Sequence, residues 1–227
     1  MKKRAVISTV ASVALAGVMC VGFAACADKA ESMKGEEVDK ATWEAAFAAA
    51  NFENVKIEMK SSLKAEMEGQ SYKESEEGEL IIADGKAYYK MHAEASGEGE
   101  EETEDVEQYE SKAEGDVIIY TKNDAGNWAV NDDEYSMAFS GVNQYIALAS
   151  QYEMFEYSAD KKGYVMKAGA GEGVSLSGLG AVYKFQNGKL AAIWAEVDAS
   201  MNGASTKGSM SVIFTYGGQS VTLPTVA

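Results

Sequence analysis

Hydrophobic and polar residues alternate strictly between Val55 and Met67. The odd positions hold Val, Ile, Met, Ser, Leu, Ala and Met, whereas every even position holds Lys, Glu or Ser. Successive side chains of a β-strand point to opposite faces. The pattern therefore predicts one long strand of about 40 Å with one apolar face and one polar face.

Further segments read as strands because each is bounded by residues typical of turns. Asp84-Gly85 and Asn187-Gly188 predict tight hairpins, and Gly217-Gly218 predicts a last hairpin that closes the chain. Short connections between consecutive strands indicate antiparallel neighbours in a meander of about ten to twelve strands. The segments are ELIIA, KAYYKMHA, DVIIYTK, NWAV, MFEYSA, GYVMKA, AVYKFQ, KLAAIWAEV, SMSVIFTY and QSVTLP.

Two segments have helical period instead. Trp43, Ala46, Phe47 and Ala50 recur at i, i+3, i+4 and i+7, with Asp39 or Thr42 as the candidate N-cap. Residues 137–152 carry a second apolar stripe, made of Val142, Tyr145, Ile146, Ala149 and Tyr152. A sheet with one apolar face needs a cover, and these two helices are the candidates. The fold class is thus α+β and mostly antiparallel β.

The N-terminus has the pattern of an export signal. Lys2, Lys3 and Arg4 precede 21 residues, Ala5–Ala25, that hold no acid or base besides the thiol of Cys20. A basic start, an apolar run and small residues at its end are typical of a secretory signal peptide. Two alternatives stay open: an ordinary cleavage site with an incidental cysteine, and an uncleaved helix long enough to span a membrane. All three place the body outside the cytoplasm, the helix by the positive-inside rule.

The end of this run, Phe23-Ala24-Ala25-Cys26, resembles the lipobox of bacterial lipoproteins. The resemblance implies that the Cys26 sulfur receives a diacylglyceryl group and that cleavage makes Cys26 the new N-terminus. Cys20 is the alternative lipidation site, but it follows Met19, which is too large for a position where the lipobox has a small residue. Two acyl chains are enough for stable membrane anchoring. We therefore expect a signal peptide at 1–25, a lipidated cysteine and polar tether at 26–37, one β-rich domain at 38–227, and a location on the extracytoplasmic face of a membrane.

Charge and cysteine content narrow the possible functions. Without residues 1–25, 202 residues remain, enough for one domain, and 17 lysines stand against 36 acids for a net charge of −19. Nucleic acid is excluded as a partner, because its binding depends on cations that neutralise phosphates. With Cys20 removed and Cys26 acylated, the body has no disulfide, thiol nucleophile or thiolate metal site.

Candidate chemistry is sparse. Glu94–Glu110 is rich in acids without a base, which predicts a solvated loop; calcium binding is the alternative, although no EF-hand-like spacing is present. His92 is the only histidine and cannot form a histidine-rich metal site. We expect no catalytic residue, metal or cofactor and hence no enzyme; an enzyme that uses His92 or the Glu100–Glu104 cluster ranks third.

The order of elements, with its leading helix, long hairpins, intervening helix and final YGGQSVTLP, resembles the LolA-like and LppX-like lipoproteins and carriers. This resemblance implies a strongly curved, open half-barrel whose two helices cover its concave face over an apolar cavity for acyl chains. Methionines on strands fit either a core or an adaptable apolar surface. The candidate ligand lining is Met59, Leu63, Met67, Met91, Met210 and Phe214.

These observations favour a membrane-anchored, non-enzymatic binder of a lipid or another apolar or amphipathic ligand. The alternative is a structural or protein-interaction module of the cell envelope, with a solid core and an acidic surface that faces cationic partners. The two differ in whether the apolar face of the sheet is filled by the chain itself.

Overall fold

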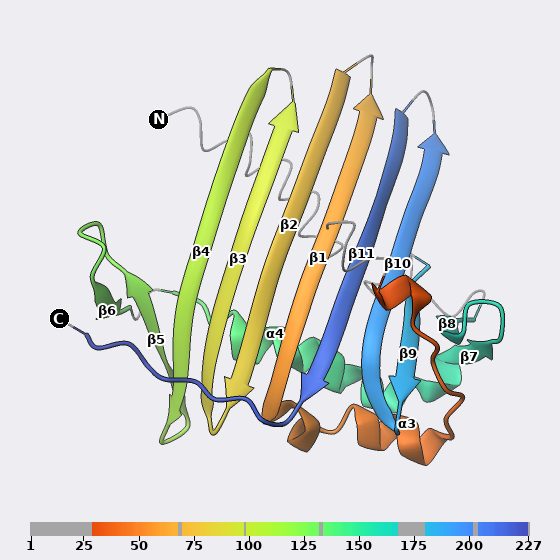
Figure 1. Ribbon diagram of the computed structural model, residues 1–227, viewed down its shortest axis with the longest axis horizontal. Helices are drawn as coiled ribbons and strands as arrows, with labels where there is room; N and C mark the ends of the chain where they lie inside the picture. Colours follow the sequence, from red (N-terminus) through yellow and green to blue (C-terminus); the bar gives the residue numbers. More distant parts are fainter. Residues whose placement is uncertain are drawn as a thin grey trace.

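Eleven antiparallel strands form a single sheet in the computed structural model (Figure 1). The structure describes residues 29–226 except 68–69, 98, 132–133, 168–179 and 202–203. The side chains of residues 67, 199–201 and 204 are also outside the description, as are residues 1–28 and 227, and with them the expected signal peptide and Cys26.

The sheet consists of two meanders that meet in its middle. The first runs through β1 (Asn54–Met67), β2 (Gln70–Ala83), β3 (Lys86–Gly97), β4 (Glu100–Ala113), β5 (Asp116–Lys122) and β6 (Trp128–Val130). The second runs through β7 (Phe155–Ser158), β8 (Gly163–Met166), β9 (Val182–Gln186), β10 (Lys189–Met201) and β11 (Ala204–Tyr216). The order across the sheet is β6-β5-β4-β3-β2-β1-β11-β10-β9-β8-β7.

This topology confirms the α+β, mostly antiparallel class and the open sheet. Edge strands β6 and β7 stand at opposite ends of the order, so the sheet is not closed into a barrel. The strands do not form one simple meander. After β6 the chain crosses from one edge of the sheet to the other, where β7 begins. Once β7–β11 have returned, β11 pairs with β1 over twelve residue positions, from Val55–Tyr216 to Glu66–Ser205.

The turn residues form the predicted hairpins. Asp84 and Gly85 have φ angles of 51° and 71°, and Asn187 and Gly188 have 51° and 69°. Both central residues of a type I′ turn need positive φ, which Asn, Asp and Gly tolerate best. These turns join β2 to β3 in continuous register, and β9 to β10 with one register shift between Leu190 and Ala192.

The first predicted helix is α3 (Lys40–Ala46), and Asp39 caps it by accepting a hydrogen bond from the Thr42 N–H at 2.8 Å. Trp43 and Phe47 are fully buried, as the helical period predicts. The stripe ends earlier than predicted: the chain continues as the 3-10 helix η1 (Ala49–Phe52), where Ala50 is exposed and Phe52 is buried instead.

The segment 137–152 is α4 (Ala138–Ile146) followed by the 3-10 helix η2 (Ala147–Met154). It is the crossing connection, and it runs behind one end of the long strands in Figure 1. We call the face that it covers the inner face. Val142 and Tyr145 are buried against this face, as predicted.

An aromatic cluster fills the space between the sheet and the helices. The Trp43 ring lies 5.0 Å from Phe47, 4.9 Å from Phe155 and 5.2 Å from Phe185, centroid to centroid. Its indole N–H donates to the Leu148 carbonyl of η2 at 2.9 Å, which satisfies the only polar atom of the side chain. This end of the molecule is a packed core.

Two further predictions are wrong. The acidic segment Glu94–Glu110 is not a loop, because it forms the end of β3 and most of β4, paired from Lys86–Ser111 to Gly97–Glu100. The segment after Gly217-Gly218 is not a strand, because residues 219–226 have no regular structure. Since β11 already pairs with β1 on one side and β10 on the other, it has no free edge for a hairpin partner.

No helix among the described residues is long and apolar enough to cross a membrane.

Part of the expected tether is in contact with the sheet: Ala30 is fully buried on the face opposite α4, in a small cluster with Val182, Ala192, Trp194 and Ile213.

Candidate ligand-binding face

The six predicted lining residues all occupy positions of the strand register that face inward, but they differ in burial. Met210 and Phe214 are each only 6% exposed and belong to the core. Met59 and Met91 are half-buried and pack at the edge of that core. Leu63 is half-buried four residues farther along β1 than Met59. The side chain of Met67, the last residue of β1, lies outside the described residues.

The long strands continue past the helices, as Figure 1 shows. We call this continuation the distal inner face. The first two rows of this continuation hold two residues each of β1, β2, β3 and β4 and one of β11, and the name refers to these rows. They are Ser61, Leu63, Glu74, Glu76, Ala93, Ala95, Glu102, Glu104 and Gly208.

The four glutamates of this face lie in two rows with alanine between them. Glu76 is opposite Ala93, which is opposite Glu104, and Glu74 is opposite Ala95, which is opposite Glu102. Because alanine is short, the glutamate side chains on either side meet little steric obstruction above it. None of the named positions of the distal inner face carries a basic side chain.

Burial perturbs two of these carboxyl groups. The pKa of Glu74 is raised by burial. The pKa of Glu76 is raised by burial and by the negative charge of Glu74, against a smaller lowering from the Ser61 hydroxyl, and the Ser61 side chain is 4% exposed. A carboxylate in such surroundings favours either a proton or a cation from outside.

Several charged side chains on the opposite, outer face of the same strands form ion pairs. Lys60 lies 2.8 Å from Glu77 and Lys56 lies 3.0 Å from Glu79, each across β1 and β2. His92 Nδ1 lies 2.8 Å from Asp105, and this carboxylate and that of Glu94 raise the pKa of the imidazole. His92 is therefore a half-exposed member of a surface ion-pair network.

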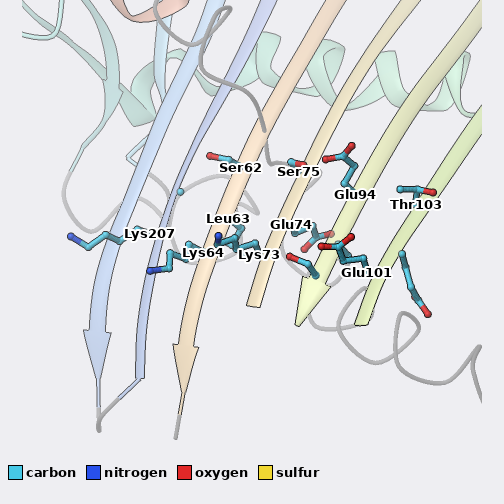
Figure 2. Close-up of a pocket in the computed structure, with 14 residues that line it drawn as sticks. Ser62, Leu63, Lys64, Lys73, Glu74, Ser75, Glu94, Glu101, Thr103 and Lys207 are labelled. Atoms are coloured by element: carbon cyan, nitrogen blue, oxygen red, sulfur yellow. The ribbon is translucent and has the colours of Figure 1, made fainter. Parts of the chain in front are cut away.

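A hollow of about 620 Å³ crosses β11, β1, β2, β3 and β4 near their distal ends (Figure 2). Most of its lining belongs to two neighbouring rows that point outward, so we place it on the outer face. Lys207, Lys64 and Lys73 stand directly opposite one another on three adjacent strands at one end, and Glu94 and Glu101 lie at the other. Its lining is charged and does not match the expected apolar cavity.

Within the residues that the structure describes, no group of three or more His, Cys, Asp or Glu side chains is arranged to hold a metal ion. The sequence prediction missed Glu74 and Glu76 as members of the inner face. The signal was present: in QSYKESEEGELIIA, Glu74 and Glu76 have the same parity as Leu80 and Ile82, and so they share a face with them.

Comparison with protein-family models, with curated proteins and with solved structures found no match to this chain.

Proposed function

We propose that this chain is an exported, lipid-anchored protein that binds an amphipathic ligand with a cationic group, without catalysing a reaction. The ligand lies on the distal inner face, with its apolar part over Met59, Leu63 and Met91. One observation carries the proposal: half-buried apolar side chains and two glutamates with raised pKa values lie next to one another on the inner face, while the lysines of β1, β2 and β3 lie on the outer face.

The chemistry of the face supports this class of ligand. Thioether side chains are flexible and adapt to apolar ligands of differing shape. A cation that settles between Glu74 and Glu76 reduces the repulsion between the two carboxylates and replaces the water that they lose on burial. An anionic amphiphile meets the same carboxylates and is repelled, so the face selects by charge.

The test uses the protein purified from the membranes of cells that produce the full chain, held in lipid nanodiscs. Fluorescence titrations compare a dansylated long-chain amine with the same chain as a neutral amide and as a carboxylate, each corrected for empty nanodiscs. We expect the amine to bind tightest, the amide more weakly and the carboxylate least. Equal binding of all three would remove the charge selection, and no binding above empty nanodiscs would refute the ligand itself.

Neighbouring residues of one strand supply matched variants. Glu76→Gln reduces the preference for the amine, because it removes a charge from the inner face. Glu77→Gln removes the same charge from the outer face of β2, where the carboxylate pairs with Lys60, and leaves the preference unchanged. Leu63→Gln weakens binding of the amine and the amide alike, whereas Ser62→Gln on the outer face does not.

The second candidate is a protein-interaction module, which the charged hollow on the outer face favours. Its lysine row and its acidic end suit a protein partner with charges of both signs. Capture of a partner from envelope material that is lost at high salt, and lost in Lys73→Gln, supports this function, because exposed charge pairs are screened by salt.

A further inference from the structure

The N-terminal segment Lys29–Val38 is a fixed part of the body. The Lys184 side chain, 1% exposed in the middle of β9, donates through Nζ to the Ala30 carbonyl at 2.8 Å and to the Glu31 carbonyl. A buried ammonium needs such partners, since an unpaired charge in the interior is costly. The carbonyl groups of the segment thereby satisfy the buried Lys184 ammonium, and these hydrogen bonds hold the segment on the sheet.

Backbone contacts continue this attachment along the segment. The Gly35 N–H donates to the Lys162 carbonyl at 2.9 Å, and the Glu36 N–H donates to the Phe185 carbonyl at 2.8 Å. The approach at Gly35 is close: a Cβ there would lie 2.6 Å from the Lys162 carbonyl oxygen. Farther on, the Val38 N–H donates to the Tyr164 hydroxyl at 2.9 Å, where the segment reaches α3.

This attachment shortens the connection to the expected anchor. From Cys26 to Lys29 the chain makes three steps, which reach about 10 Å at most when fully extended. A tether of twelve residues, as the sequence suggests, would let the body move freely above the membrane. A tether of three residues keeps the outer face of β8, β9 and β10 next to it.

Charge and side-chain type at this place fit a lipid surface. Residues 29–37 and 160–162 together hold four lysines and four acids and so have no net charge. The net charge of −19 comes from the remaining 13 lysines and 32 acids of the exported body. Lys161 lies over the Trp194 ring at 5.9 Å from Nζ to the centroid, and Met33 packs against the same cluster. Trp194 is only 7% exposed and supports this packing from beneath. Lysine side chains such as that of Lys161 lie readily at membrane interfaces, because their alkyl stems rest on apolar surface while their charged ends stay in water.

We propose that the outer face of β8–β10, together with Lys29–Lys34, which packs on it, lies against the bilayer that holds the anchor, and that the strongly acidic edge at β4–β6 points away. This orientation rests on the proposed lipid anchor at Cys26. It leaves the distal inner face turned away from the anchored surface and open to ligands from solution.

The test measures energy transfer from a labelled cysteine to acceptors in the lipid headgroups. The acylated protein has no other cysteine, so Lys162→Cys and Val130→Cys give single donors near opposite edges of the sheet. Nine strand spacings separate β8 from β6, about 40 Å. We expect several-fold higher transfer from position 162 than from position 130. Equal transfer from the two positions would overturn the orientation.

A variant pair tests the attachment itself. Gly35→Ala places a methyl group against the Lys162 carbonyl, so we expect the difference between the two donors to shrink and residues 29–38 to exchange their amide hydrogens faster. Gly141→Ala in α4, where a Cβ meets no atom within 4 Å, leaves both unchanged. Absence of fatty acid on Cys26 refutes the anchor and the orientation together, whereas acylated protein with equal transfer refutes only the orientation.

Discussion

The two ends of the inner face are built from the same strands but have opposite character. At the helix-covered end, Val55, Ile57 and Phe214 are buried and belong to one core with Trp43. At the distal end, the same strands present Ser61, Leu63 and the glutamates of β2 and β4. The strands therefore remain long and regular at the distal end through their backbone pairing, whereas apolar packing is concentrated where α3, α4 and η2 cross the sheet.

The largest effect is expected from the covered end. Trp43→Ala removes a fully buried side chain that contacts the rings of Phe47, Phe155 of β7 and Phe185 of β9. We expect a loss of about 3–5 kcal/mol in the free energy of unfolding. Leu63→Ala at the distal end costs about 1 kcal/mol or less, because that side chain is half-buried. Urea denaturation measures both. Similar losses at the two positions would contradict the division of the face.

A smaller effect is expected where β4 meets the crossing helix. Glu110 is fully buried and accepts hydrogen bonds from the Ala138 N–H at 2.7 Å and the Ser136 hydroxyl at 2.6 Å. It acts as the N-cap of α4, whose own Met137 supplies no side-chain cap. Glu110→Ala leaves these donors unsatisfied and should cost about 2–3 kcal/mol.

The matched control for this change is Glu104→Ala, on the same strand and the same face but exposed at the distal end. Its effect should stay within about 0.5 kcal/mol. If the two glutamates proved equally important for stability, the cap would not be what holds α4 on the sheet.

The smallest effect concerns pH at the distal end. The folded-state pKa of Glu76 is raised above its ordinary value of 4.5, so its charged form opposes folding. Its stability contribution is complete below that value and is lost as pH rises through the folded-state pKa. Glu76→Gln should therefore raise Tm at pH 7, and the gain should disappear below about pH 4.

Thermal unfolding from pH 4 to pH 8 checks this dependence. Glu77→Gln, which breaks a pair with Lys60 on the outer face, should not raise Tm at any pH. A Tm for Glu76→Gln at or below that of the unchanged protein at pH 7 would show that this carboxylate is satisfied within the chain.

Much of the architecture could be predicted from local pattern. Period-two alternation located β1 to within one residue, and Asp84-Gly85 located the β2–β3 hairpin, because these features depend on residues that are close in the chain. The acidic strand β4 was missed, since a run of glutamates opposes strand formation locally. It forms because β3 pairs with it from Glu100 to Ser111, β5 pairs with Tyr109–Ala113, and the Glu107 carboxylate lies 2.5 Å from Lys122.

The candidate face was only partly predictable. The sequence indicated that Met59, Leu63 and Met91 share a face. It did not indicate that Met210 and Phe214 are buried in the core, or that Glu74 and Glu76 lie beside the three half-buried residues. That distinction depends on how far α3 and α4 extend along the strands, which no pattern within a strand records.

By itself, the amino-acid sequence determined the antiparallel class, the hairpin turns, the two helical segments and the strong negative charge of the body, because each follows from neighbouring residues or from composition. Only the tertiary structure decided that β11 pairs with β1, that a buried Lys184 fixes the N-terminal segment, and that Glu110 caps a helix 28 residues away. These are contacts between distant parts of the chain, and they form only where packing brings a charge or an unsatisfied backbone group within reach of its partner.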